Sequence, residues 1–426
     1  MLRSIKLRGI GPVAKLDATL GSRLNVVTGD NGLGKSFWLD ACFWALTGSW
    51  PNGKTALPTP GDKIKPTIIY EVVGETSLAT TQPNVASFSW PSQTWTRPRG
   101  RPFIPGLVVY AAVDGSFSVW DPARNYWRDS TSGTSRVSEP PRAYQFTPDT
   151  LANGLEDGAR VLCNGLIADW VEWYYQHAHS PKKSPFAHLK EVIDLLSHPD
   201  EPITCEEPRK VFIDDSRKFP TLGFPYGVVP YPQWSAGVKR VVSLAYLLVW
   251  AWIEHEQAAE LRHEKPTSQI ILIVDEVESH LHPRWQRTIL PALLKVVETL
   301  RADVAVQLLT ATHSPLVLAS LEPYFNAETD EFFRFDLEHN HVTFTNLPWT
   351  IHGDVVGWLT SDIFGLEQAR SREAEEAIEA AEAFIRGDPT KLTDQLQTKE
   401  QITRSLQRLL PSFDPFWPRW LVEAPA

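Results

Sequence analysis

Residues 29–36 read Gly-Asp-Asn-Gly-Leu-Gly-Lys-Ser, and both the residue types and their spacing suit the binding of a phosphate chain. The segment fits the pattern Gly-x-x-x-x-Gly-Lys-Ser/Thr, in which glycines let backbone N–H groups turn inward around an anion. Lys35 would reach the β- and γ-phosphates of a nucleotide, and the Ser36 hydroxyl would hold Mg²⁺. The predicted nucleotide contacts are Gly29, Asp30, Asn31, Gly32, Gly34, Lys35 and Ser36.

Two carboxylates follow a run of apolar residues further along the chain. Residues 270–274 are Ile-Ile-Leu-Ile-Val, which is typical of a buried strand, and Asp275 and Glu276 come directly after them. Ligands of open α/β sheets bind at the carboxyl ends of the strands. We therefore expect Asp275 to support Mg²⁺ and Glu276 to orient an attacking water as general base. A strand that merely ends in exposed acids is the alternative.

Two further segments add a histidine and a second anion-binding feature. Residues 307–312 also suit a buried strand, and the imidazole of His313 after them could contact a γ-phosphate and sense its loss. Ser235 and Gly237 open a long helical pattern over residues 237–262, and such a helix start offers N–H groups and a hydroxyl to an anion. Taken alone, Ser235 is more simply a helix cap. Because the phosphate loop already covers one side of a nucleotide, the second anion site predicts closure by another protomer.

These side chains require a sheet that brings several strand ends together. A strand over residues 24–28 leads into the phosphate loop, a helix over 36–46 follows it, and strands at 270–276 and 304–310 alternate with helices, which predicts an α/β lobe. The Pro-, Gly- and Trp-rich stretch between the two halves predicts twisted antiparallel strands. Its tryptophans, Trp90, Trp95, Trp120 and Trp127, would fill a small β core or else stack on bases or a partner. The predicted organisation is a first lobe segment at 1–48, a β-rich insertion at 49–141, a helical lobe at 142–234, a second lobe segment at 235–350 and a helical tail at 351–426.

The overall composition limits the classes of partner. The chain has 426 residues, of which 42% are hydrophobic and 22% charged, as in ordinary globular proteins. Its net charge of −10 excludes a surface that is basic all over, so nucleic acid would need a local basic groove. The three cysteines, Cys42, Cys163 and Cys205, lack metal-ligand spacing and indicate a reducing compartment, for which the cytoplasm is the default. The most apolar stretches, 241–253 and 270–274, are too short to span a bilayer, so no membrane partner is expected.

The order of the motifs, from the phosphate loop through Ser-x-Gly and Asp-Glu to Thr-His-Ser-Pro, resembles the ABC-type ATPases of the RecF, SMC and OLD group. The resemblance covers residues 1–48 and roughly 142–350, and it implies an α/β fold, a P-loop ABC-type ATPase head with a β-rich insertion and a helical lobe. It implies ATP and Mg²⁺ as cofactors, and a homodimer or higher homo-oligomer joined through an ATP sandwich. By the same resemblance, the signature residues are Ser235 and Gly237, the D-loop at the dimer interface runs from His280 to Pro283, the switch histidine is His313, and the nucleotide-sensing glutamine is Gln145, for which a lobe-surface residue is the alternative.

Several departures from the group narrow the resemblance. The signature Ser-Ala-Gly-Val-Lys-Arg differs from the transporter form Ser-Gly-Gly-Gln. The sequence between the phosphate loop and the signature has no long heptad tract, so we do not expect coiled-coil arms. The residues after His313 are too few for the nuclease domain appended in OLD-type proteins. The chain is similar to stand-alone bacterial anti-phage defence ATPases such as the Septu ATPase family, whose members work with an HNH nuclease encoded beside them. This similarity implies an ATP-hydrolysing enzyme that has no nuclease site of its own and controls a separate effector nuclease.

A RecF- or SMC-like ATPase that clamps DNA in repair or genome maintenance is the alternative function. Such a clamp needs cationic contacts, because neutralised phosphates supply most of its affinity. The candidates are Arg97, Arg99, Arg101, Lys182 and Lys183, for which a solvated loop is the plainer interpretation. Salt-dependent DNA binding by the isolated protein would favour the clamp, and copurification with a small nuclease would favour the effector function.

Overall fold

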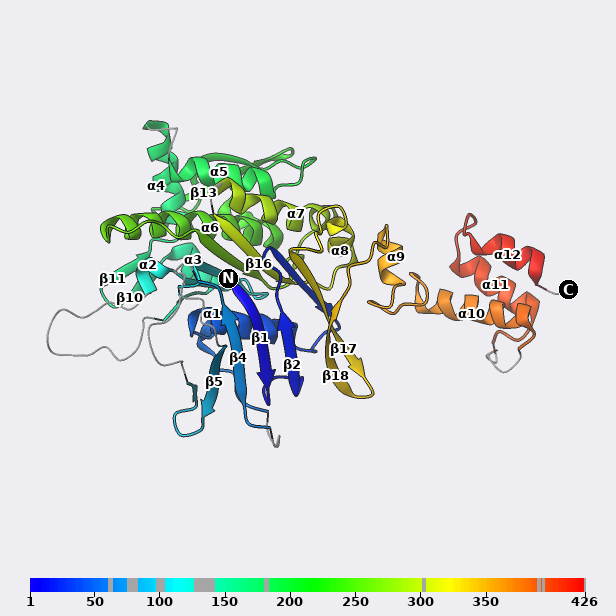
Figure 1. Ribbon diagram of the computed structural model, residues 1–426. Coiled ribbons are helices and arrows are strands. Elements are labelled where there is room, and N and C mark those ends of the chain that lie inside the picture. The colour runs from blue at the N-terminus through cyan, green and yellow to red at the C-terminus, as the bar shows by residue number, and fades with distance from the viewer. Residues whose placement is uncertain are drawn as a thin grey trace. The chain divides into compact units, whose positions relative to one another are not determined.

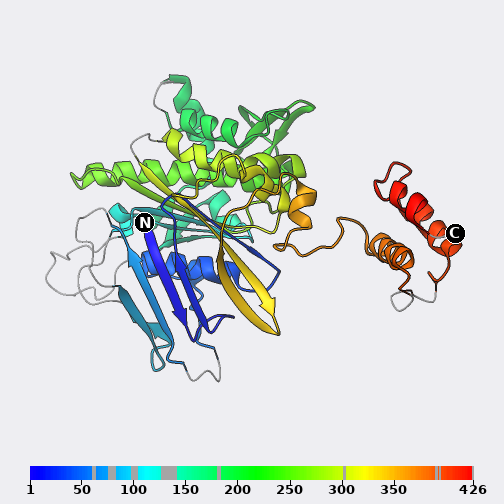
Figure 2. The ribbon, with the colours of Figure 1, turned by 45° about the vertical axis from the view of Figure 1, so that its right-hand side comes forward.

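The structure is a computed structural model that describes residues 1–59, 64–74, 83–96, 104–125, 142–179, 184–300, 304–388, 392 and 395–424 (Figure 1). The chain divides into two compact units, Met1–Ile351 and His352–Ala426. The larger unit contains two extended β-sheets with helices packed against them, and Figure 2 shows it from a second side. The Arg97, Arg99 and Arg101 segment, Lys182, Lys183 and Trp127 lie outside the described residues.

An eight-stranded sheet with the order β18-β17-β3-β16-β15-β7-β8-β9 forms the centre of the larger unit. Its parallel strands are β3 (Leu24–Gly29), β7 (Leu107–Ala111), β15 (Gln269–Val274), β16 (Ala305–Ala311) and β17 (Asp330–Glu338). The antiparallel partners at its two ends are β8 (Phe117–Trp120), β9 (Tyr144–Phe146) and β18 (His341–Leu347). Because β3, β16 and β15 are neighbours and parallel, their carboxyl ends meet along one edge of the sheet.

Helix α1 (Lys35–Thr47) lies between this sheet and a second sheet of five strands. The second sheet has the order β2-β1-β4-β5-β6 and consists of β1 (Leu2–Arg8), β2 (Lys15–Thr19), β4 (Thr67–Val72), β5 (Asn84–Ser89) and β6 (Thr94–Trp95). One hydrophobic core joins α1 residues such as Trp38 and Phe43 to Ile5 of the second sheet and Ile271 of the central sheet. The phosphate loop is thus followed by a helix that is buried from two sides.

Helices α6 (Ala236–Leu261), α7 (Pro283–Leu300) and α8 (Pro315–Leu321) belong to the other side of the central sheet from α1 (Figure 1). By length and composition α6 is apolar enough to cross a bilayer, and it is the one such helix among the described residues. Its residues Val242, Tyr246 and Val249 are fully buried in the protein, as in the core helix of a globular domain.

A helical lobe with small sheets packs on α6 and α7. It contains α4 (Leu166–His179) and α5 (Pro185–Leu196), and α5 contacts both α6 and α7. A three-stranded sheet of β12 (Thr204–Lys210), β13 (Lys218–Phe224) and β14 (Gly227–Pro230) precedes α6. The remaining elements are α2 (Pro122–Asn125), α3 (Pro148–Asn153), the hairpin of β10 (Leu155–Asp157) and β11 (Arg160–Cys163), and short 3-10 turns at Pro51–Gly53 and Tyr231–Gln233.

The stretch expected as a β-rich insertion at 49–141 contributes strands to both large sheets. Strands β4 to β6 extend the sheet of β1 and β2, whereas β7 and β8 belong to the central sheet. Trp95 and Trp120 are buried, and Trp90 is 64% exposed and stacks edge-on against Phe88. Trp95 and Trp120 therefore fill β cores, as one of the two interpretations of these tryptophans expected. The predicted α/β class is confirmed by the parallel central sheet with helices on both faces.

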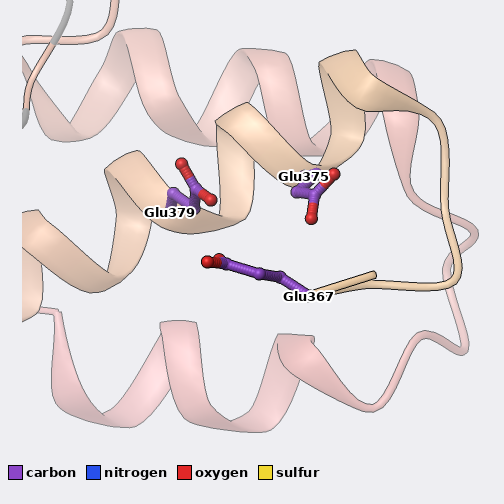
Figure 3. A group of neighbouring side chains, drawn as sticks. All are labelled: Glu367, Glu375 and Glu379. Atoms are coloured by element: carbon purple, nitrogen blue, oxygen red, sulfur yellow. The ribbon is translucent and has the colours of Figure 1, made fainter. Parts of the chain in front are cut away.

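The smaller unit contains α9 (Val355–Leu359), α10 (Arg372–Arg386), α11 (Lys399–Leu409) and α12 (Phe416–Glu423). Helices α10 to α12 share a core that includes Ile378, Leu406 and Trp420. The carboxylates of Glu367, Glu375 and Glu379 gather beside α10, with their nearest oxygens within 4.8 Å of one another (Figure 3). A hydrogen bond to Glu367 raises the pKa of Glu379.

Candidate functional site

The phosphate loop connects the carboxyl end of β3 to the first turn of α1, and its glycines have backbone conformations that other residues rarely adopt. The φ angles of Gly29, Gly32 and Gly34 are +134°, +78° and +105°. A Cβ atom on Gly29 would lie 2.1 Å from the carbonyl oxygen of Phe335, and one on Gly34 would lie 2.4 Å from Cγ of Pro12. A Cβ on Gly32 would meet no atom within 4 Å, so this side of the loop is open. Asp30, Asn31 and Ser36 are exposed on the loop.

Lys35 folds back onto the loop that carries it. Its Nζ donates hydrogen bonds to the carbonyl oxygens of Gly29 at 2.9 Å and Asp30 at 2.7 Å. Burial lowers the pKa of Lys35, and the nearby carboxylates of Glu276 and Asp275 oppose that shift. The ammonium group therefore lies among acceptors at the mouth of the loop, where a phosphate oxygen could replace the two carbonyls.

Asp275 follows β15 and is almost fully buried, with 1% of its surface exposed. Its carboxylate accepts a hydrogen bond from Ser36, while Oδ1 is buried without a hydrogen-bond partner among the described residues. Burial raises the pKa of Asp275. A carboxylate oxygen without a partner beside a hydroxyl is a donor set that suits Mg²⁺, which prefers hard oxygen ligands and keeps several waters. The residues present thus fit the predicted cation.

Glu276 and His313 meet across the ends of β15 and β16. Nε2 of His313 lies 3.3 Å from Oε1 of Glu276, and Ser279 Oγ donates to Oε2 of Glu276 at 3.1 Å. Glu276 has a φ of +45°, unusual for a residue with a side chain and found where surrounding structure fixes the backbone. Burial and the charge of Lys35 lower the pKa of His313, and Glu276 opposes that shift. The site therefore places a carboxylate and an imidazole beside the lysine of the phosphate loop.

Arg240 on α6 was not among the predicted site residues, and it ties that helix to two strand ends. Its guanidinium donates to the carbonyl oxygens of Ala112 at 3.1 Å and Val113 at 2.9 Å after β7, and to those of Asp275 at 2.6 Å and Glu276 at 3.2 Å after β15. Its position five residues after Ser235 gave no sign of this role, because the acceptors are all backbone oxygens.

Glu278 was also missed, although the Asp-Glu-x-Glu pattern contains it. Its Oε1 accepts hydrogen bonds from the backbone N–H of His313 at 2.6 Å and from Thr312 Oγ1 at 2.9 Å. The signal that could have identified Glu278 is its place two residues after Glu276, on a loop that faces the end of a neighbouring strand.

Ser235 and Gly237 stand at the start of α6, as predicted for a helix start. Ser235 is exposed, and its Oγ accepts from the N–H of Val238 at 3.3 Å, which is an N-cap hydrogen bond. Gly237 is buried, and a Cβ on it would lie 2.6 Å from the carbonyl oxygen of His280. The structure therefore brings the predicted signature and D-loop together within one chain. Their roles toward a second protomer stay predictions.

Gln145 lies on β9, the last strand of the central sheet on the side of β7 and β8. Its Oε1 accepts from Ser118 Oγ at 2.5 Å and from the N–H of Asn52 at 2.8 Å, beyond the C-terminal end of α1. These contacts hold the side chain against β8 and the turn after α1, so the role of nucleotide sensor stays a prediction.

The central sheet, the phosphate loop and the acids at a neighbouring strand end give the chain the α/β fold of a P-loop ATPase. Residues 4–77 match a protein-family model described as "AAA domain", and residues 225–319 match one described as "AAA domain, putative AbiEii toxin, Type IV TA system". The Septu protein PtuA of Bacillus mycoides (strain KBAB4) is 32% identical over 97 residues. Those residues are 22% of this chain and span 12% of the length of PtuA.

Solved structures of related shape cover most of the chain at low sequence identity. The SMC head domain from Thermotoga maritima has a TM-score of 0.37 and 16% identity, covering 82% of this chain and 99% of that one. An SmcHead bound to the C-winged helix domain of ScpA has a TM-score of 0.44 and 14% identity, with 81% and 98% covered. The recombination mediator protein RecF has a TM-score of 0.35 and 12% identity, with 81% and 98% covered.

Proposed function

We propose that this chain binds and hydrolyses ATP with Mg²⁺, and that ATP joins two copies head to head and thereby controls a separate effector. The observation that carries the proposal is the meeting of three kinds of group at the ends of β3, β16 and β15, which are neighbours in the sheet. The phosphate loop follows β3, His313 follows β16, and the two acids follow β15.

The proposed reaction is attack of water on the γ-phosphorus with loss of the bond to the β–γ bridging oxygen. Lys35 would exchange its two loop carbonyls for phosphate oxygens, and Ser36 and Asp275 would hold Mg²⁺, which neutralises phosphate charge. Glu276 would accept the proton of the attacking water, and His313 at 3.3 Å would hold the Glu276 carboxylate in place and contact the γ-phosphate. Gly29, Asp30, Asn31, Gly32 and Gly34 would supply the backbone cradle.

The proposed partners are a second copy of this chain and an effector nuclease. The exposed Ser235 at the start of α6 offers an anion-binding helix end to a nucleotide held by the other copy. The similarity to PtuA over part of the chain supports a role in anti-phage defence, with an HNH-type nuclease as effector by family analogy. We place this activity in the cytoplasm. The chain spans 12% of the length of PtuA in that comparison.

The test is the solution mass of purified Glu276→Gln protein, coexpressed with its genomic neighbour, with and without Mg-ATP. This variant should keep ATP bound while hydrolysis is slow, because it loses the general base but keeps the phosphate loop. The proposal expects the mass to rise by whole protomers with ATP and the neighbour to stay bound. A mass that is indifferent to ATP, with no partner retained, contradicts the head-to-head mechanism. Salt-dependent DNA binding by a protein whose mass does not respond to ATP would instead favour the DNA clamp.

A further inference from the structure

Glu278 bridges the loop after β15 and the loop after β16. Its Oε1 accepts from the backbone N–H of His313 at 2.6 Å and from Thr312 Oγ1 at 2.9 Å. Its Oε2 is buried and has no hydrogen-bond partner among the described residues. One carboxylate oxygen therefore fixes two consecutive residues of the β16 loop from a position two residues after the proposed general base.

The hydrogen bonds around Thr312 continue this restraint into the next helix. Thr312 Oγ1 also accepts from the N–H of Ser314 at 3.0 Å, and Ser314 Oγ donates to Gln286 Oε1 at 2.8 Å. Ser314 also caps α8, since its Oγ accepts from the N–H of Val317 at 3.2 Å. The side-chain position of His313 thus depends on a backbone that is held on both sides of it.

Two different acids restrain His313 at two points, and its ring also forms a hydrogen bond with the backbone of Gly29. Glu278 binds its backbone N–H, and Glu276 lies 3.3 Å from its ring nitrogen Nε2. Losing the Glu278 acceptor leaves a partly buried N–H unpaired and frees the backbone, so the ring is no longer directed at Glu276.

We propose that Glu278 is a positioning residue that holds the His313 ring beside the Glu276 carboxylate for hydrolysis. This inference rests on the proposed ATPase function. Among the described residues the hydrogen bonds of Glu278 go to the loop after β16, so its positioning role should affect kcat and leave the KM for ATP nearly unchanged. The charge of Glu278 also acts on Lys35, and Glu278→Gln, which loses the charge but keeps the hydrogen bonds, separates that effect from positioning. Partners that orient a functional side chain from behind it typically account for about 10- to 100-fold in activity.

The first comparison is between Glu278→Met and Glu278→Gln, measured by steady-state ATP hydrolysis. Methionine removes the acceptor at similar size, and kcat should fall about 10- to 100-fold with KM unchanged. Glutamine keeps a carbonyl oxygen that can accept both hydrogen bonds, so it should restore most of the rate. If the Met variant does not fold, Thr312→Val keeps the Glu278 carboxylate and removes the hydroxyl that donates to it and accepts from the N–H of Ser314, and kcat should fall about fivefold.

The second comparison repeats Glu278→Met in a His313→Ala background. If Glu278 acts through His313, adding Glu278→Met to the His313→Ala protein should change kcat by less than about twofold. Equal losses in both backgrounds, or a kcat of Glu278→Met equal to that of the wild type, would overturn the inference.

Asp169→Asn is the matched control. It also neutralises a buried carboxylate that accepts two side-chain hydrogen bonds, but this carboxylate lies in the helical lobe, so kcat should stay unchanged. A wild-type protein that does not hydrolyse ATP would refute the proposed function itself, so the two failures are distinct.

Discussion

Arg240 should be a principal link between α6 and the ends of β7 and β15, and Arg240→Gln tests this directly. Its guanidinium binds four backbone carbonyl oxygens, three of them in part-buried surroundings. Counting only the bonds to Ala112 and Asp275 at about 1.5 kcal/mol each, the substitution should lower the free energy of unfolding by about 3 kcal/mol. The fourth bond, to Glu276, means that the backbone of the proposed general base loses a support, so kcat should also fall at least about tenfold.

The assay is urea unfolding followed by circular dichroism, with ATP hydrolysis measured on the same preparations. Lys239→Gln is the matched control, because it removes one positive charge from the preceding position of α6, where Lys239 contacts the ring of Tyr231. It should cost less than about 0.5 kcal/mol. Equal unfolding free energies for the two variants would refute the reasoning, since the effect would then follow from charge and not from the carbonyl contacts.

Two further predictions concern groups next to the phosphate loop. Burial raises the pKa of Asp40 from 3.8 to about 6, so stability should fall as the pH rises between those values, and Asp40→Asn should remove that slope and raise the unfolding free energy at pH 7.5 by up to about 3 kcal/mol in urea titrations. An unchanged slope would contradict this assignment. Gly34→Ala should cost at least about 2 kcal/mol and abolish ATP binding in calorimetry, because the new Cβ would lie 2.4 Å from Pro12, whereas Gly32→Ala meets no atom within 4 Å and should cost less. The reverse order of the two glycine variants would contradict the steric argument.

The elements that carry local signals could be predicted from the sequence, and the P-loop α/β fold is confirmed. The phosphate loop, the apolar strand before Asp275 and the helix start at Ser235 are each encoded within a few consecutive residues. The contributions of 49–141 to two sheets could not be predicted, because strand pairing joins segments that are far apart in the chain. Alternating patterns show that strands exist, but not which sheet they extend.

The two missed site residues show the same limit at the level of side chains. Arg240 binds carbonyl oxygens, which carry no residue identity, so no sequence motif marks its partners. Glu278 meets His313 through a backbone N–H that lies 35 positions away along the chain. The predicted site residues were instead visible because side-chain chemistry and spacing alone define a phosphate loop and a strand that ends in acids.

The most direct test of the account is phosphate release from Mg-ATP by the purified wild-type chain and by Lys35→Ala. Lys35 lies at the mouth of the loop, where its ammonium donates hydrogen bonds to the carbonyl oxygens of Gly29 and Asp30, which a phosphate could replace. The account predicts ATP hydrolysis by the wild type and its loss, together with loss of ATP binding, in a Lys35→Ala protein that is folded by circular dichroism. Hydrolysis at the wild-type rate by Lys35→Ala would contradict the account.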